Sequence, residues 1–72
     1  MSAPVPLTIA SNEAEAEIIR GLLETAGIPS MHRPTNFGAG ATDGFTPSGA
    51  REVLVNPEQL EDAKIVLEDA GI

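Results

Sequence analysis

Two stretches of the chain share one pattern of hydrophobic and polar positions. Residues 12–28, NEAEAEIIRGLLETAGI, align without a gap with residues 56–72, NPEQLEDAKIVLEDAGI. In both, apolar residues recur at the three- and four-residue spacing of one helical face. Each stretch follows a short run rich in β-branched or apolar residues, VPLTIA before the first and REVLV before the second. The pattern therefore predicts a strand–helix unit that occurs twice.

The first copy predicts a helix over about residues 13–26. Asn12 is expected to cap its start, with Glu15 completing a capping box, and Gly27 is expected to end it in a left-handed conformation. The buried face is predicted to consist of Ala16, Ile19, Leu22, Leu23 and Ala26.

The second copy predicts a helix over about residues 57–70. Asn56 is its expected cap, Pro57 its first residue, and Gln59 the partner in a second capping box. Its buried positions correspond one by one to those of the first helix: Leu60, Ala63, Val66, Leu67 and Ala70. Leu67 is therefore expected to be the core equivalent of Leu23.

Three strands are predicted, over about residues 5–10, 28–33 and 51–55, from β-branched residues and alternating polarity. Pro6 removes one backbone donor, which places the first strand at the edge of a sheet. The order strand–helix–strand–strand–helix predicts one α+β domain over residues 1–72. The expected architecture is a ferredoxin-like sandwich with an antiparallel sheet, both helices on one face, and a missing or vestigial fourth strand.

The amino-acid composition argues against several kinds of binding site and partner. It has 72 residues, no cysteine and one histidine, which excludes a disulfide framework and argues against a metal site. Because so small a domain buries little surface, a partner subunit is the expected source of extra stability. The net charge of −7 disfavours nucleic acid and anionic membranes as partners. With no span or signal peptide in the pattern, a soluble cytoplasmic protein is expected.

Residues 34–50, PTNFGAGATDGFTPSGA, form the predicted connection between the second and third strands. A loop of this length is often functional. It contains both aromatic residues of the chain, which either anchor the loop on the sheet or bind a partner as exposed hot spots. The predicted partner-binding residues are Phe37, Gly38, Gly40, Asp43 and Phe45.

No catalytic or cofactor-binding pattern is found, so the chain is not expected to be an enzyme or to hold a cofactor or metal. His32 has no nucleophile at a motif spacing, and a lone histidine of this kind is more often a hydrogen-bonding residue near a loop. The loop glycines lack the following helix and the lysine that phosphate-binding loops need. Acidic residues at the helix starts, including Glu17, are explained by the helix dipole.

The repeat, the glycine-rich loop and the segment EVLVNPEQLEDAKIVLEDAG together resemble a family of small bacterial proteins called putative prokaryotic signal-transducing proteins, a domain of unknown function. The resemblance extends from about Leu7 to Gly71. It implies a ferredoxin-like fold similar to that of the nitrogen-regulatory PII proteins, in which a long loop at the place of residues 34–50 engages partners. The nucleotide-binding motifs of the PII proteins are absent, so their ligands are not implied.

Two functions fit these features. The preferred one is a non-catalytic regulatory or signal-transducing module that presents the 34–50 loop to a protein partner. The alternative is a small-ligand sensor that binds a metabolite between loop and sheet or between subunits. Thermal stabilisation by a metabolite would favour the sensor.

A homodimer is also expected, because one side of the predicted sheet has no helix to cover it. The alternation places Leu7 and Ile9 toward the helices, together with the valines of the first and third strands. The opposite side of the sheet is then predicted to be apolar. On the second helix, Ile65 is predicted to lie opposite the buried face. The predicted self-association residues are Ala10, Met31, Leu54 and Ile65.

Overall fold

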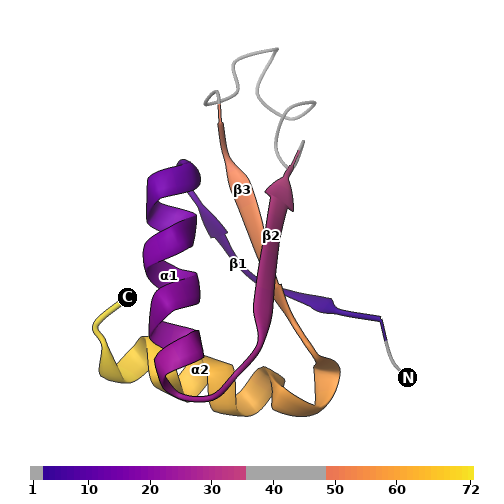
Figure 1. Ribbon diagram of the computed structural model, residues 1–72, viewed down its shortest axis with the longest axis vertical. Helices are drawn as coiled ribbons and strands as arrows, with labels where there is room; N and C mark the ends of the chain where they lie inside the picture. The colour runs from indigo at the N-terminus through magenta and orange to yellow at the C-terminus, as the bar shows by residue number, and fades with distance from the viewer. Residues whose placement is uncertain (1–2, 36–48) are drawn as a thin grey trace.

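The computed structural model describes residues 3–35 and 49–72. Its elements follow the predicted order, with a short 3-10 helix (η1) before the second α-helix (Figure 1). They are β1 (Val5–Ala10), α1 (Glu13–Thr25), β2 (Ser30–Pro34), β3 (Arg51–Val55), η1 (Pro57–Gln59) and α2 (Leu60–Asp69). The predicted α+β class is confirmed.

The three strands form one antiparallel sheet in the order β1-β3-β2. This is the strand order of a ferredoxin-like fold without its fourth strand, which would lie beside β1. Within the described residues β1 pairs only with β3, so Pro6 lies on an edge strand as its missing backbone donor predicted.

The start of α1 is held by its predicted cap. The side chain of Asn12 accepts a hydrogen bond from the backbone N–H of Glu15 at 2.8 Å. The Glu15 carboxylate in turn accepts from the backbone N–H of Ser11 at 2.6 Å. The reciprocal bond of the capping box is therefore made one residue before the cap, and the bond to Asn12 satisfies a donor that the helix leaves free.

Both α-helices end in the same way, as the repeated Ala-Gly-Ile predicts. At the end of α1, Gly27 has φ of 82° and donates to the carbonyl of Glu24, while Ile28 donates to the carbonyl of Leu23 at 2.8 Å. At the end of α2, Gly71 and Ile72 make the equivalent pair of bonds. These are Schellman motifs, and positive φ explains why glycine stands at both positions.

The start of the second helix differs from the prediction. The side chains of Asn56 and Gln59 make no capping hydrogen bond. Instead, the backbone carbonyl of Asn56 accepts from the N–H of Gln59 at 2.9 Å. Because this 3-10 bond uses the donor that a capping side chain would bind, η1 takes the place of the predicted capping box, and α2 begins at Leu60.

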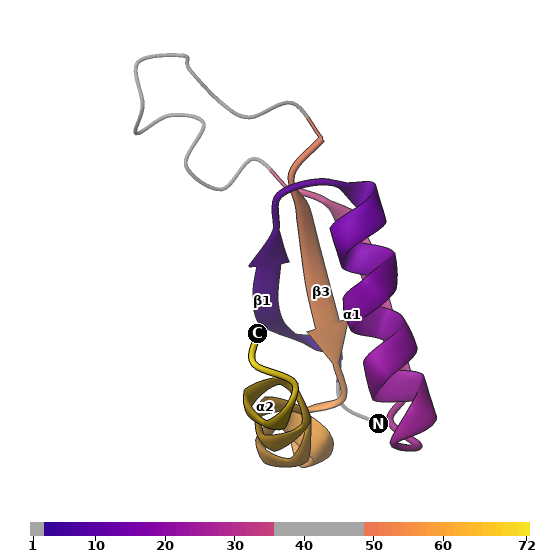
Figure 2. The same cartoon turned by 90° about the vertical axis from the view of Figure 1, so that its left-hand side faces the viewer.

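Both helices pack on one face of the sheet, where α1 runs along the strands and α2 crosses its lower end (Figures 1 and 2). The buried core combines residues from both copies of the sequence repeat with residues of the sheet. Its members are Ala10, Ala16, Ile19, Leu23, Ile28, Val53, Val55, Ala63 and Leu67. Leu23 and Leu67 thus occupy the core positions that the repeat assigned to them, whereas Ala26 and Ala70, which were also predicted to be buried, are exposed at the helix ends.

The predicted orientation of Ile9 and Ala10 is wrong. The pairing of β1 with β3 shifts register between Pro6 and Thr8, so Leu7 is an extra residue in a β-bulge. Beyond the bulge the alternation reverses, since one inserted residue exchanges the two faces of a strand. Ala10 is therefore completely buried against the helices, whereas Ile9 is 42% exposed on the other side.

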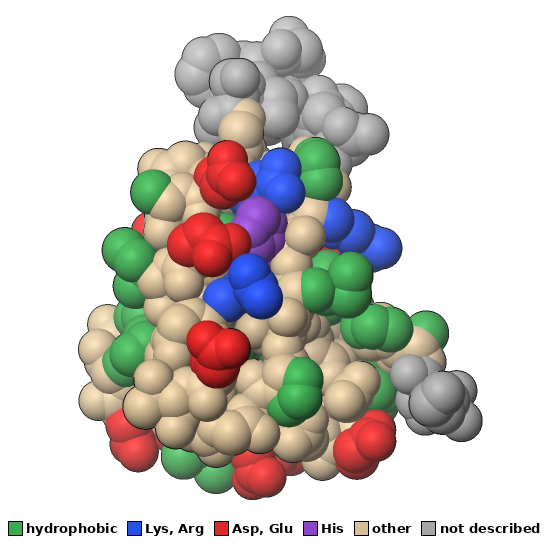
Figure 3. Space-filling model, in the orientation of Figure 1, with side chains coloured by type: hydrophobic (Ala, Val, Ile, Leu, Met, Phe, Trp, Pro, Cys, Tyr) green, Lys and Arg blue, Asp and Glu red, His purple; other side chains and the backbone are tan. Residues whose placement is uncertain are grey.

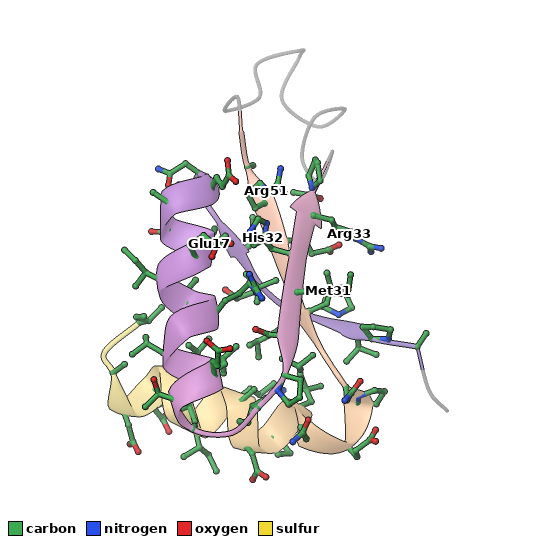
Figure 4. All side chains as sticks on the ribbon, viewed as in Figure 1. Glu17, Met31, His32, Arg33 and Arg51 are labelled. Carbon is green, nitrogen blue, oxygen red and sulfur yellow. The ribbon has the colours of Figure 1, made fainter. Side chains whose placement is uncertain are left out.

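We call the side of the sheet opposite the helices the open face. Cross-strand pairing arranges its side chains in two rows, the first with Leu54 of β3 at its centre and the second with Glu52. The rows are Pro6–Leu54–Met31 and Ile9–Glu52–Arg33. Figure 4 shows the side chains of Met31 and Arg33 pointing away from α1.

Replacing either repeated leucine by alanine should destabilise the protein strongly. Leu23→Ala and Leu67→Ala each remove a buried side chain, which costs about 2–5 kcal/mol in protein cores. That is a large part of the stability of a small domain. Chemical denaturation of both variants measures the loss, with Ile18→Ala, exposed on α1, as the control. Variants that melt like the parent would contradict the core assignment.

A matched pair of substitutions tests the bulge. Ala10→Glu should unfold the protein, because it places a charge in the apolar core, whereas Ile9→Glu should leave it folded because Ile9 is already partly exposed. Circular dichroism at low protein concentration distinguishes the two. The reverse result, with Ile9→Glu unfolded and Ala10→Glu folded, would contradict the bulge and show that side chains alternate along β1 without interruption.

Candidate functional site

The paired ends of β2 and β3 form the stem from which residues 36–48 depart. The strands pair from Ser30 with Val55 to Pro34 with Arg51, and Thr35 continues the stem by donating to the carbonyl of Ala50 at 3.3 Å. The loop residues predicted to bind a partner lie outside the described part of the chain: Phe37, Gly38, Gly40, Asp43 and Phe45.

His32 connects this stem to α1. Its Nε2 lies 2.5 Å from a carboxylate oxygen of Glu17, and Arg51 donates from Nε to its Nδ1 at 3.0 Å. A guanidinium has no acceptor, so Nδ1 must carry a lone pair and Nε2 the proton. His32 therefore donates to Glu17 and accepts from Arg51, and only 9% of its side chain is exposed.

Arg20 extends the same network along the helix. Its guanidinium donates to the Glu17 carboxylate at 3.1 Å and to the backbone carbonyl of Ser30 at 3.3 Å. We call Glu17, Arg20, His32 and Arg51 the stem cluster. In Figure 3 the histidine, in purple, lies among acidic and basic side chains, and Figure 4 shows Glu17 beside it at α1 and Arg51 above it. The cluster joins α1, β2 and β3 through three side-chain contacts and one bond to the backbone of β2.

The stem cluster suits a structural role better than a chemical one. Both ring nitrogens of His32 already have partners, so neither is available as a general base or metal ligand without breaking a bond. Over the described ranges, no three acidic or histidine side chains come together as a metal site would require. The geometry agrees with the interpretation of His32 as a hydrogen-bonding residue beside the loop.

The stem cluster also determines how Glu17 titrates. The hydrogen bond from His32, followed by that from Arg20, holds the pKa of the Glu17 carboxyl below its ordinary value, because both favour the charged form. Desolvation opposes this shift without cancelling it. The charged carboxylate is thus the form that the folded protein stabilises.

The four residues predicted to mediate self-association do not share one surface. Met31 and Leu54 are neighbours on the open face, but Ala10 is in the core, and Ile65 is exposed on α2, on the helical side of the molecule. Ile9 was missed, since the bulge that exposes it has no signal in the alternation.

The sequence reasoning also missed the functional grouping of Glu17, Arg20 and Arg51. The spacing of Glu17 and Arg20, three residues apart on a helix, was a visible signal for an ion pair. Their connection to His32 and Arg51 depends on how the helix lies over the sheet, which no local pattern indicates.

Comparison with known proteins identifies one family. Its model, DUF2007, is described as putative prokaryotic signal transducing protein and matches residues 6–71. No curated protein and no solved structure matches the chain. Across the described residues, neither helix has the length and apolar character needed to cross a membrane.

Replacing Glu17 by glutamine should lower stability at neutral pH, and the deficit should shrink in acid. Because the pKa of Glu17 is lower in the folded than in the unfolded chain, its contribution is complete above the ordinary glutamate pKa of about 4.3. The contribution is lost as the pH falls through the lower, folded value. Denaturation of parent and Glu17→Gln across acid pH measures this difference.

Glu24→Gln is the matched control for the loss of a carboxylate from α1. Glu24 lies on the same helix, and its carboxylate has no hydrogen bond to any described residue. This variant should be about as stable as the parent at neutral pH, because the substitution breaks no hydrogen bond to a described residue. A deficit of Glu17→Gln that stays constant from neutral to acid pH would contradict the assigned network.

Proposed function

Because the chain belongs to the family of putative prokaryotic signal transducing proteins, we propose that it is a regulatory module that acts by binding another protein. The family description supports signal transduction in general. The finer proposal, a non-catalytic module that presents its 34–50 segment to a partner, is supported by the stem cluster and by the composition of that segment.

The proposal rests mainly on the hydrogen bonds of the stem cluster, which hold the stem against α1. Arg51 is the first residue of β3, and its bond to His32, continued to Glu17, ties that strand end to α1. The two chain ends at which the segment is attached therefore keep a defined position relative to the helix. Such an attachment limits the entropy that binding through the segment would cost.

The segment supplies the kind of residues that a protein interface uses. Phe37 and Phe45 are the only aromatic residues of the chain, and aromatic side chains are enriched among interface hot spots. Gly38, Gly40 and Asp43 lie between them in sequence and complete the proposed binding segment.

A ligand sensor is the second candidate, favoured by one shallow pocket at the end of the open face. Its volume is about 140 Å³. The lining is mostly apolar: Pro4, Pro29, Ser30, Met31, Leu54, Val55 and Asn56. Sites for drug-sized ligands usually measure about 300–1,000 Å³, so the pocket of one subunit is small for a metabolite site. The interaction module is therefore the better-supported function.

A capture experiment with three baits tests the interaction module. The parent should enrich a specific protein from lysate, and Phe37→Ser combined with Phe45→Ser should reduce its capture at least about tenfold, because hot-spot residues carry most of the binding energy. Ile18→Ser, an exposed change on α1, is the control and should capture as the parent does. Equal capture by the double variant would reject the segment as the binding site.

A thermal-shift screen with metabolites distinguishes a ligand sensor from the interaction module. A metabolite that binds only the folded state raises the melting temperature of the protein, and the rise continues as the metabolite concentration increases above its dissociation constant. If a metabolite stabilises the parent but not Met31→Lys, and no protein is captured through the segment, the sensor replaces the interaction module.

A further inference from the structure

The open face carries an apolar patch that the described residues leave largely uncovered. Leu54 lies at its centre and is only 2% exposed, whereas Met31 beside it is 48% exposed and Ile9 is 42% exposed. Pro6 lies on the other side of Leu54. Contiguous exposed apolar patches on a protein surface mark candidate sites for a partner.

The open face is also nearly free of net charge. Eight of the eleven acidic residues lie in α1 and α2, which pack on the opposite face, Glu58 lies in η1 beyond the end of β3, and Asp43 is outside the described residues. The remaining one, Glu52, forms an ion pair with Arg33 at 2.8 Å on the open face itself. Two copies with a charge of −7 each therefore repel one another least when their open faces approach.

Strand addition at the sheet edges is the competing way to associate, and the edges are protected against it. On β1, Pro6 removes a donor and the bulge at Leu7 breaks the regular spacing of backbone groups. On the other edge, β2 is preceded by Pro29 and ends at Pro34. Proline and bulges are common devices that prevent edge pairing.

We propose that the open face is the contact surface of a homodimer, in which two copies stack sheet against sheet about a two-fold axis. The contact consists of Met31, Ile9 and Pro6 around Leu54, with the Arg33–Glu52 pair at its side. Met31 is unbranched and adaptable, and the partner's shallow pocket beside Leu54 offers a place for it. This inference is independent of the 34–50 segment.

The size of the face predicts a weak dimer. Three strands spaced ~4.8 Å apart, with five or six residues of ~3.3 Å each, cover roughly 14 by 17 Å. Stable interfaces bury about 800 Å² on each partner, so this face belongs to the small, reversible class. The dimer should therefore form at micromolar to millimolar concentrations, and added salt should strengthen it by screening the residual repulsion.

Analytical ultracentrifugation across protein concentration, at low and high salt, tests the dimer. Met31→Glu should raise the dissociation constant at least about tenfold, because a two-fold axis brings both new charges into one apolar contact. Ile9→Glu should act in the same direction. Ile65→Glu is the control, since it places the same charge on a similarly exposed isoleucine of α2. Circular dichroism verifies that each variant is folded.

A charge-swap experiment identifies the face directly. Met31→Lys alone should also weaken the dimer, but an equal mixture of Met31→Lys and Met31→Glu should form a heterodimer more tightly than either variant forms a homodimer. This rescue supports the two-fold contact at Met31.

Three results would overturn the proposal. The first is a parent that stays monomeric at millimolar concentration and high salt. The second is a dimer that Ile65→Glu weakens and Met31→Glu does not. The third is a mixture of the two Met31 variants that associates no better than its components.

Discussion

The central position of β3 is the constraint on which the rest of the structure depends. β3 is the only described strand with a neighbour on each side, and Val53, Leu54 and Val55 are almost completely buried. Val53 and Val55 anchor the helices, while Leu54 anchors the opposite side of the sheet. Two faces of different character therefore share one strand, and both the stem cluster and the open face are organised around it.

The two faces divide the chemistry of the chain between them. The helical side carries most of the acidic residues and the stem cluster, in which His32 uses both ring nitrogens to join α1 to the sheet. The open face is apolar and balanced in charge. This division allows an acidic protein to remain well hydrated on one side and to offer a low-charge surface on the other, which is why we assign association between copies to the open face.

Both proposed contacts begin at β2. Its alternation directs His32 toward α1 and Met31 away from it (Figure 4). His32 thus belongs to the stem cluster on one face of the sheet, and the adjacent Met31 belongs to the proposed dimer contact on the other face. A change at Met31 should leave the hydrogen bonds of His32 intact, so the proposed partner binding and the proposed dimer are separable in experiment.

Local patterns in the sequence determined the order of the strands and α-helices and the α+β fold class. They also determined the cap at Asn12 and the two helix ends that finish at a glycine. These features depend on residues a few positions apart, and the sequence repeat made them visible twice. The family resemblance agreed with them.

Tertiary structure alone decided the features that position the candidate site. The bulge at Leu7 depends on pairing between β1 and β3, whose paired residues on either side of the bulge are 48 and 45 positions apart, and it reversed the predicted faces of Ile9 and Ala10. The bonds from His32 to Glu17 and Arg51 likewise join residues 15 and 19 positions away. Periodicity records which residues are apolar, but register and contact across elements follow from packing the whole chain, so no local pattern could reveal them.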